Sequence, residues 1–182
     1  MIDYQSLEKH RKELKEELLN LIKENSRVAC VQATGMGKSH IIAELCNELP
    51  GNKIVLEPGI EVINYMEQFN IETYNTSYIT YHSLLHKDIN ELIESFKDFD
   101  YIFLDEMHRA LAEKWGKVLN KIFDSIKDLD NKIIGFSATP IRGDRKDVVE
   151  EIFNGVQTKP YYLADAILDN LLPNPDYHCR NI

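Results

Sequence analysis

The chain has 182 residues, of which 43% are hydrophobic and 28% charged, enough apolar material for one domain with a sizeable core. Its formal net charge of −9 argues against a protein that grips nucleic acid unaided, because such proteins present a basic face to the phosphates. No apolar run approaches the ~20 residues of a membrane-spanning helix, and three cysteines without metal-ligand spacing predict reduced thiols in a cytoplasmic protein.

Hydrophobic periodicity predicts alternating helices and strands along the chain. Apolar residues at helical spacing over residues 6–24 predict an amphipathic helix. Short apolar runs predict buried strands at residues 28–31, 53–56, 77–80, 101–104 and 131–136, and helical spacing recurs at residues 40–49, 88–96 and 115–126. This alternation predicts an α/β fold whose mostly parallel sheet is flanked by helices on both faces.

The first predicted strand leads into a glycine-containing loop of sequence ATGMGKS at residues 33–39. Its two glycines allow the positive φ angles that a loop wrapped around a triphosphate needs. Lys38 is placed to reach the β- and γ-phosphates, and Ser39 to ligate magnesium. Gln32 replaces the first glycine of the usual phosphate-loop pattern, and an ordinary turn before an amphipathic helix is the alternative. The predicted nucleotide-binding residues are Thr34, Gly35, Met36, Gly37, Lys38 and Ser39.

An acidic motif of sequence DEMH at residues 105–108 follows the strand predicted at residues 101–104. An aspartate at the end of a buried strand can hold magnesium through water, and an adjacent glutamate can orient or deprotonate the attacking water. We therefore predict that Asp105, Glu106 and Lys38 are catalytic and that Ser39 and Asp105 are the magnesium ligands. For an isolated Asp-Glu pair the alternative is a helix N-terminus, whose dipole favours carboxylates.

A third strand runs into the sequence SATP at residues 137–140. The three strand-end motifs, in this order, resemble those of the first RecA-like lobe of superfamily two helicases and translocases: a phosphate loop, a DExH box and a Ser-Ala-Thr motif. The resemblance implies a P-loop NTPase domain that binds ATP and Mg²⁺. Residues 54–69 and 78–84 look like motifs Ia and Ib of that lobe, and residues 140–142 and 162–173 resemble its end in the branch related to type III restriction-enzyme helicase subunits.

The resemblance also implies roles for other residues. His108, Ser137 and Thr139 match positions that couple the nucleotide site to the grip on nucleic acid, although Ser137 and Thr139 could instead cap the turn at Pro140. Gln5 is similar to the glutamine that reads adenine, and a solvated surface glutamine is the alternative. In the family, motifs Ia and Ib touch one nucleic-acid strand; the matching residues here are Pro58, Gly59, Thr80 and Tyr81.

Chain length limits what one such lobe can do. Helicases of this superfamily bind ATP between two RecA-like lobes, and an arginine of the second lobe completes the site. We expect residues 1–172 to form the first lobe and residues 173–182 to be a linker or tail toward a second lobe that this chain lacks. Because arginine fingers contribute about 10³- to 10⁵-fold in rate, the chain alone should hydrolyse ATP slowly. Arg142 is the nearest cation, and a phosphate or surface contact beside Asp144 is its simpler interpretation.

The sequence therefore predicts the ATP-binding motor lobe of a nucleic-acid helicase or translocase. The branch resemblance favours DNA over RNA as the partner, by analogy between families. A nucleotide-binding regulatory or interaction module without motor activity is the alternative, and the Ser-Ala-Thr motif argues against it because a plain switch has no need of that motif. A small-molecule kinase fits poorly, since a DExH box has no role there.

Overall fold

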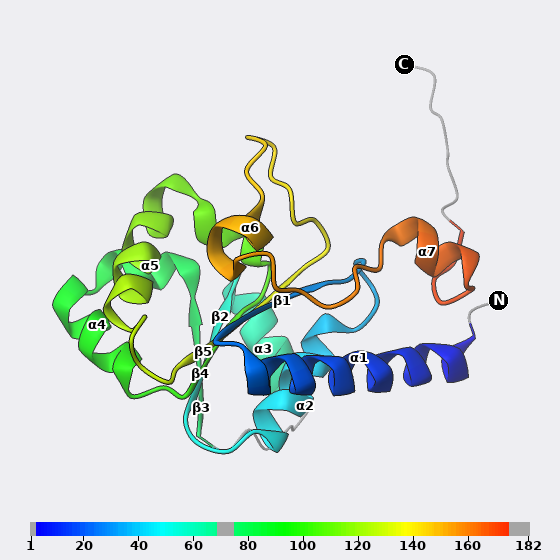
Figure 1. Ribbon diagram of the computed structural model, residues 1–182, viewed down its shortest axis with the longest axis horizontal. Coiled ribbons are helices and arrows are strands. Elements are labelled where there is room, and N and C mark those ends of the chain that lie inside the picture. Colours follow the sequence, from blue (N-terminus) through cyan, green and yellow to red (C-terminus); the bar gives the residue numbers. More distant parts are fainter. Residues whose placement is uncertain (1–2, 69–74, 175–182) are drawn as a thin grey trace.

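The computed structural model describes residues 3–68 and 75–174 of the chain (Figure 1). At its centre is a five-stranded sheet in which every pair of neighbouring strands is parallel. The strand order is β1 (Arg27–Val31), β5 (Lys132–Ser137), β4 (Tyr101–Leu104), β2 (Lys53–Glu57) and β3 (Thr76–Thr80). The predicted α/β fold is confirmed, and the sheet built by the described residues is entirely parallel.

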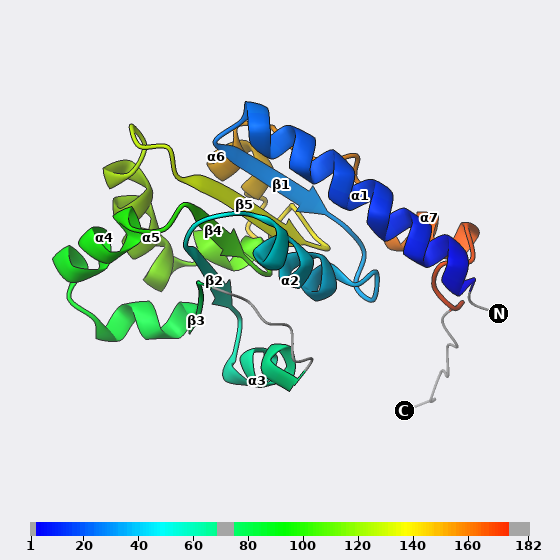
Figure 2. The same ribbon diagram turned by 90° about the horizontal axis from the view of Figure 1, so that it is seen from below.

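A helical segment follows each strand and returns the chain across the sheet, as parallel strands require. The helices are α1 (Tyr4–Glu24), α2 (Lys38–Glu48), α3 (Ile60–Gln68), α4 (Ile89–Lys97), α5 (Glu113–Ser125), α6 (Val148–Phe153) and α7 (Leu163–Leu168), with 3₁₀ helices η1 (Tyr81–His86) and η2 (Met107–Leu111) after β3 and β4. They cover both faces of the sheet, as the second view shows (Figure 2).

The core is divided into two layers, because successive residues of a strand point to opposite faces of the sheet. On β1, Val28 and Cys30 pack in the layer of α1 and α2, whereas Ala29 and Val31 belong to the layer of α4, α5 and α6. All five residues of β2 are buried. Strands buried on both faces read as continuous apolar runs, which is why the sequence alone could locate them.

The outer edge of β1 is covered by a segment that periodicity did not predict. Residues 156–161 run parallel to β1 and exchange backbone hydrogen bonds with Ala29 and Val31. α7 follows and lies beside the N-terminal end of α1 in both views (Figure 1, Figure 2). It joins an apolar cluster of Leu7, Ala33, Met36, Ala166 and Leu171. The loop after β1 is therefore packed between the first and last helices.

Several boundaries and segments differ from the predictions. α1 begins at Tyr4 because the Asp3 side chain accepts the backbone N–H groups of Gln5 and Ser6 and caps the helix. α6 and α7 have six residues each, too few for periodicity to reveal. Phe69 and residues 175–182 of the predicted linker lie outside the described residues. Within the described ranges, no helix has the length and apolar character needed to cross a membrane.

Candidate functional site

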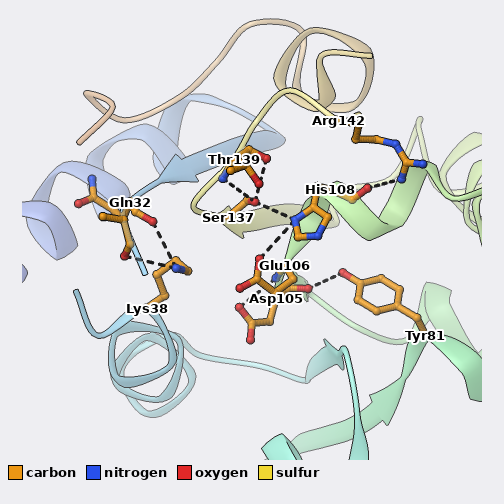
Figure 3. A network of polar contacts seen from close by, with 10 residues as sticks. Gln32, Lys38, Tyr81, Asp105, Glu106, His108, Ser137, Thr139 and Arg142 are labelled. Atoms are coloured by element: carbon orange, nitrogen blue, oxygen red, sulfur yellow. Dashed lines mark hydrogen bonds and ion pairs between the residues drawn. The ribbon is translucent and has the colours of Figure 1, made fainter. Parts of the chain in front are cut away.

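The predicted site residues gather at the carboxyl ends of neighbouring strands (Figure 3). The glycine loop follows β1, Ser137 ends β5, and Asp105 follows β4. β4 lies between β5 and β2, and its Leu104 pairs with Leu56 of β2. The strand ends therefore form one edge of the sheet, the edge at which open α/β sheets bind ligands.

The glycine loop has the backbone that its sequence predicts. Gly35 and Gly37 adopt φ values of 89° and 87°, a region that residues with a Cβ rarely enter. The guanidinium of Arg11 from α1 lies over this loop: its Nε donates to the Met36 carbonyl oxygen at 3.0 Å and would lie 2.5 Å from a Cβ added at Gly37. Sequence analysis missed Arg11, because one cation in a helix rich in charges gives no signal.

Lys38 and Ser39 are the first two residues of α2. Lys38 is 8% exposed, and its Nζ donates to the carbonyl oxygens of Gln32 at 3.2 Å and Ala33 at 3.4 Å. These two carbonyls hold the ammonium group at the sheet edge.

The other loop residues differ in their exposure. Thr34 and Gly35 are exposed, whereas the side chain of Met36 packs inward in the apolar cluster with Leu7 and Leu171. Met36 could therefore bind a ligand only through its backbone. Gln5, at the exposed start of α1, borders a surface hollow together with Arg11 and Glu44 of α2, and its adenine-reading role stays a prediction.

Hydrogen bonds to backbone groups hold the acidic motif in place. Asp105 is 5% exposed; its carbonyl oxygen accepts the Tyr81 hydroxyl at 2.8 Å, and its Oδ1 accepts the Glu106 backbone N–H at 3.0 Å. Glu106 has φ 48° and ψ 52°, a left-handed conformation that costs a non-glycine residue on the order of 1–3 kcal/mol. This conformation begins η2, and the Glu106 carboxylate lies beside His108 (Figure 3).

Three carboxyl groups at this edge differ in their pKa values. Burial raises the pKa of Glu57 to about 9, and the neighbouring charge of Asp105 adds to the effect. Burial also raises the pKa of Asp105, with the charge of Glu106 as the second cause. The hydrogen bond with His108 is the main cause of a lowered pKa at Glu106. Glu106 is therefore ionised at neutral pH, as a base for water must be, whereas Glu57 holds its proton.

His108 links the acidic motif to the Ser-Ala-Thr motif. Its Nδ1 lies 3.0 Å from Ser137 Oγ and 3.3 Å from Glu106 Oε2. Ser137 Oγ donates to the Thr139 carbonyl oxygen and accepts the Thr139 N–H, both at 3.1 Å. Because the hydroxyl proton is engaged and an ionised carboxylate only accepts, these contacts assign a proton to Nδ1. His108, Ser137 and Thr139 thus form one hydrogen-bonded chain with Glu106, and the same Ser137–Thr139 contacts cap the turn.

Arg142 contacts the backbone of His108, a member of this hydrogen-bonded chain. Its Nη1 donates to the His108 carbonyl oxygen at 2.6 Å, and its Nε lies 3.3 Å from Asp144 Oδ1. Arg142 thus makes a surface contact with Asp144. Its contact with the backbone of His108 joins residues 34 positions apart in the sequence, and no pattern in the sequence indicated it.

The predicted nucleic-acid residues have different surroundings. Pro58 and Gly59 follow β2 and are partly exposed, and Thr80 ends β3, where its Oγ1 caps η1 by accepting the Ser83 N–H at 3.2 Å. The side chain of Tyr81 is 1% exposed, so Tyr81 could contact nucleic acid only through its backbone, and that role stays a prediction. A tyrosine ring gains more from burial with its hydroxyl hydrogen-bonded than from exposure, and here the ring stacks on Trp115 with centroids 6.3 Å apart.

The described ranges contain no group of three or more His, Cys, Asp or Glu side chains arranged to hold a metal ion. Magnesium at nucleotide sites usually takes only one or two carboxylates and completes its shell with phosphates and water. The hydroxyl of Ser39 and the carboxylate of Asp105 are the oxygen ligands that this ion prefers, so the residues suit magnesium that binds together with nucleotide.

Comparison with known proteins agrees with this fold. The family described as the type III restriction enzyme res subunit matches residues 57–142. A solved structure of a nuclease-deletion mutant of the Type ISP restriction-modification enzyme LlaGI, in complex with a DNA substrate mimic, has a TM-score of 0.64 and 18% identity over 89% of this chain. The Hef helicase domain of Pyrococcus furiosus has a TM-score of 0.56 and 18% identity over 80% of it. No curated protein gives a significant match.

The two solved chains are much longer than this one, which covers 20% of the first and 36% of the second. At 18% identity the likeness shows the fold, which this chain shares with a restriction-modification enzyme and with a helicase domain. The family match adds a sequence similarity to type III restriction-enzyme res subunits. It covers the stretch from the end of β2 through the acidic motif and the Ser-Ala-Thr motif.

Proposed function

We propose that this chain, a RecA-like lobe of the superfamily two helicase type, is the ATP-binding half of a DNA helicase or translocase. The observation that carries the proposal is the hydrogen-bonded chain from Glu106 through His108 to Ser137 and Thr139. This hydrogen-bonded chain links Glu106, which follows β4 and is placed to activate water, to Ser137 at the end of β5. A module that only binds nucleotide needs no such connection, so the regulatory or interaction module is the less well supported alternative.

The residues at the sheet edge suit ATP with magnesium. Backbone N–H groups of the glycine loop and of the α2 N-terminus are donors for phosphates, and Lys38 adds an ammonium group. Ser39 and Asp105 would hold magnesium, which supplies charge neutralisation on the transferred phosphoryl group.

Glu106 would orient the attacking water and take its proton. Its hydrogen bond with His108 favours the ionised form, so the base is available at neutral pH. A change at Ser137 on β5 would alter the His108 contact and thereby the position of the Glu106 carboxylate. The proposed coupling between ATP state and nucleic-acid grip uses this path.

A second lobe is part of the proposal. Residues 1–172 would form the first lobe, and residues 173–182 would lead toward the second, whose arginine would complete the ATP site. Arg142 is unsuited to that role because it is bound to the His108 carbonyl oxygen and to Asp144. The chain alone would therefore hydrolyse ATP slowly, since an arginine finger contributes about 10³- to 10⁵-fold.

DNA is the proposed nucleic acid, because the LlaGI structure holds a DNA substrate mimic. Pro58, Gly59 and Thr80 lie at the same sheet edge as the ATP residues and could contact one strand through backbone groups and hydroxyls. Such contacts suit a lobe of net charge −9 better than a basic groove. We also propose a cytoplasmic location, which the free, buried thiols of Cys30 and Cys46 support.

The test is ATP hydrolysis by the two-lobe protein, measured with and without single- and double-stranded DNA and RNA. We expect stimulation by DNA and its loss in Lys38→Ala, while Lys117→Ala, an exposed change on α5, leaves the rate unchanged. The motor function is refuted if no nucleic acid stimulates hydrolysis and Lys38→Ala changes nothing.

His108→Ala separates the two candidate functions. We expect this variant to bind magnesium nucleotide like the unmodified chain but to lose stimulation by DNA, because the link between Glu106 and Ser137 is removed while Lys38, Ser39 and Asp105 are unchanged. Binding is followed as a rise in the melting temperature of the lobe, since a ligand at 100 times its Kd stabilises the folded state by about 2.7 kcal/mol. Full DNA stimulation in His108→Ala would favour a site that works without this connection.

A further inference from the structure

Glu57, the last residue of β2, has a buried carboxyl group that lacks a hydrogen-bond donor. The side chain is 0% exposed, and no N–H or hydroxyl group in the described part of the protein donates to either carboxyl oxygen. Its polar neighbour there is the carboxyl group of Asp105, to which the protonated Glu57 can donate. Buried polar groups are nearly always paired, because an unpaired one loses its contacts with water and gains nothing in return. A missing partner at a candidate ligand site points to a group that arrives with the ligand.

The sheet places this carboxyl group against Asp105. β2 and β4 are parallel neighbours with Leu56 opposite Leu104, and the Asp105 backbone N–H donates to the Leu56 carbonyl oxygen at 3.0 Å. The residues that follow, Glu57 and Asp105, thus stand side by side, and side chains at matching positions of adjacent strands share a face. Two carboxyl groups converge at the sheet edge.

The charges that surround Glu57 make a protein cation an unsuitable partner. The charged neighbours that act on it are Asp105 and Glu106, both acidic. The Lys38 ammonium is engaged by the carbonyl oxygens of Gln32 and Ala33. The Tyr81 hydroxyl, a possible donor at this edge, is used by the Asp105 carbonyl oxygen.

We propose that Glu57 is a further ligand of the divalent cation and binds it together with Asp105. The inference rests on the proposed function, which assigns Asp105 to magnesium. A pair of carboxylates is what Mg²⁺ uses in nucleotide sites alongside phosphates and water. On binding, the cation takes the place of the proton that Glu57 holds in the metal-free protein, and that proton is released to solvent. The cation gives the Glu57 oxygens a partner of opposite charge.

The test is the factor by which Mg²⁺ strengthens ADP binding to this chain, measured by calorimetry in excess Mg²⁺ and in EDTA. We expect Glu57→Gln to reduce that factor roughly 10- to 100-fold, as loss of a group supporting a metal does, with ADP affinity in EDTA unchanged. Glu61→Gln, an exposed change four residues along, is the matched control and keeps the factor. Glu57→Asp, which retains the charge on a shorter side chain, falls between.

Asp105→Asn separates failure of this inference from failure of the proposed function. If Asp105→Asn loses the Mg²⁺ factor while Glu57→Gln keeps it, Glu57 is no ligand and the proposed function stands. If both keep it, the assignment of magnesium to Asp105 fails, and the inference fails with it. The inference is also overturned if Glu57→Gln lowers the ADP affinity equally in Mg²⁺ and in EDTA. Glu57 would then affect ADP binding through the glycine loop and not through the cation. With one shared ion, the double variant should be no weaker than Asp105→Asn.

Discussion

Replacing Glu57 by glutamine should make the metal-free protein more stable at neutral pH. Glutamine has nearly the same shape and cannot ionise, and its amide can donate to the Asp105 carboxylate. In the folded state the pKa of Glu57 is raised to about 9, chiefly by burial, from a usual value of 4.5. The folded chain therefore keeps a proton that the unfolded chain releases as the pH rises above 4.5.

The sign and size of the effect follow from this difference. Stability falls with rising pH wherever the folded state binds more protons than the unfolded state, which for Glu57 is the window from about 4.5 to about 9. At 1.36 kcal/mol per pH unit, the loss is about 3 kcal/mol at pH 7 and about 1 kcal/mol at pH 5. Glu57→Gln removes it, and a domain of this size gains about 2–4 °C in melting temperature per kcal/mol.

The assay is thermal unfolding of both proteins in EDTA between pH 5 and pH 8.5. The expected result is a melting temperature higher in Glu57→Gln by about 6–12 °C at pH 7, with the difference shrinking toward pH 5. Glu61→Gln is the control for removing one negative charge and should show a small difference that does not change with pH. Curves for Glu57→Gln and wild type that stay parallel across the range would refute a protonated, buried Glu57.

Two other features of the structure give direct predictions. Tyr81→Phe removes the hydroxyl that donates to the Asp105 carbonyl oxygen and should lower the free energy of unfolding in urea by about 1 kcal/mol. Tyr4→Phe, at a 73% exposed position, is the control and should leave that free energy unchanged. An equal effect of the two variants would contradict the buried contact. Burial raises the pKa of Cys30 and of Cys46 to about 12, so iodoacetamide at pH 8 should leave both unmodified in the native protein and alkylate both in guanidinium. Peptide mass spectrometry reads the outcome, and rapid native labelling of either would contradict its burial.

The strands and the three strand-end motifs could be predicted because their signals are local. β1, β4 and β5 are apolar runs closed by polar motifs, and a strand buried on both faces shows that pattern whatever packs on it. The family resemblance predicted that His108 and Ser137 act together, but the sequence did not predict the hydrogen bond between them. Its distance depends on β4 and β5 being neighbours, which no local pattern encodes.

The residues that sequence analysis missed or misplaced depend on long-range packing. Glu57 is one of 30 acidic residues, and only the pairing of β2 with β4 makes it a neighbour of Asp105. Tyr81 was predicted as a nucleic-acid contact from its match to motif Ib, yet η1 places its ring on Trp115 of α5. Arg11 reaches the glycine loop because α1 lies across it, a contact 25 residues away in sequence.

The charges at the sheet edge explain how so acidic a chain can carry a phosphate site. Glu57, Asp105 and Glu106 face one lysine there, Lys38, whose charge lowers the pKa of Glu106 only after the larger effect of His108. Phosphates added to this edge without a cation would meet carboxylates and gain little from a single ammonium group. Tight binding therefore draws on positive charge from outside the lobe, which in the proposed two-lobe protein would come first from magnesium and then from the arginine of the second lobe. Dependence on both would keep hydrolysis low until the proposed two-lobe site is assembled.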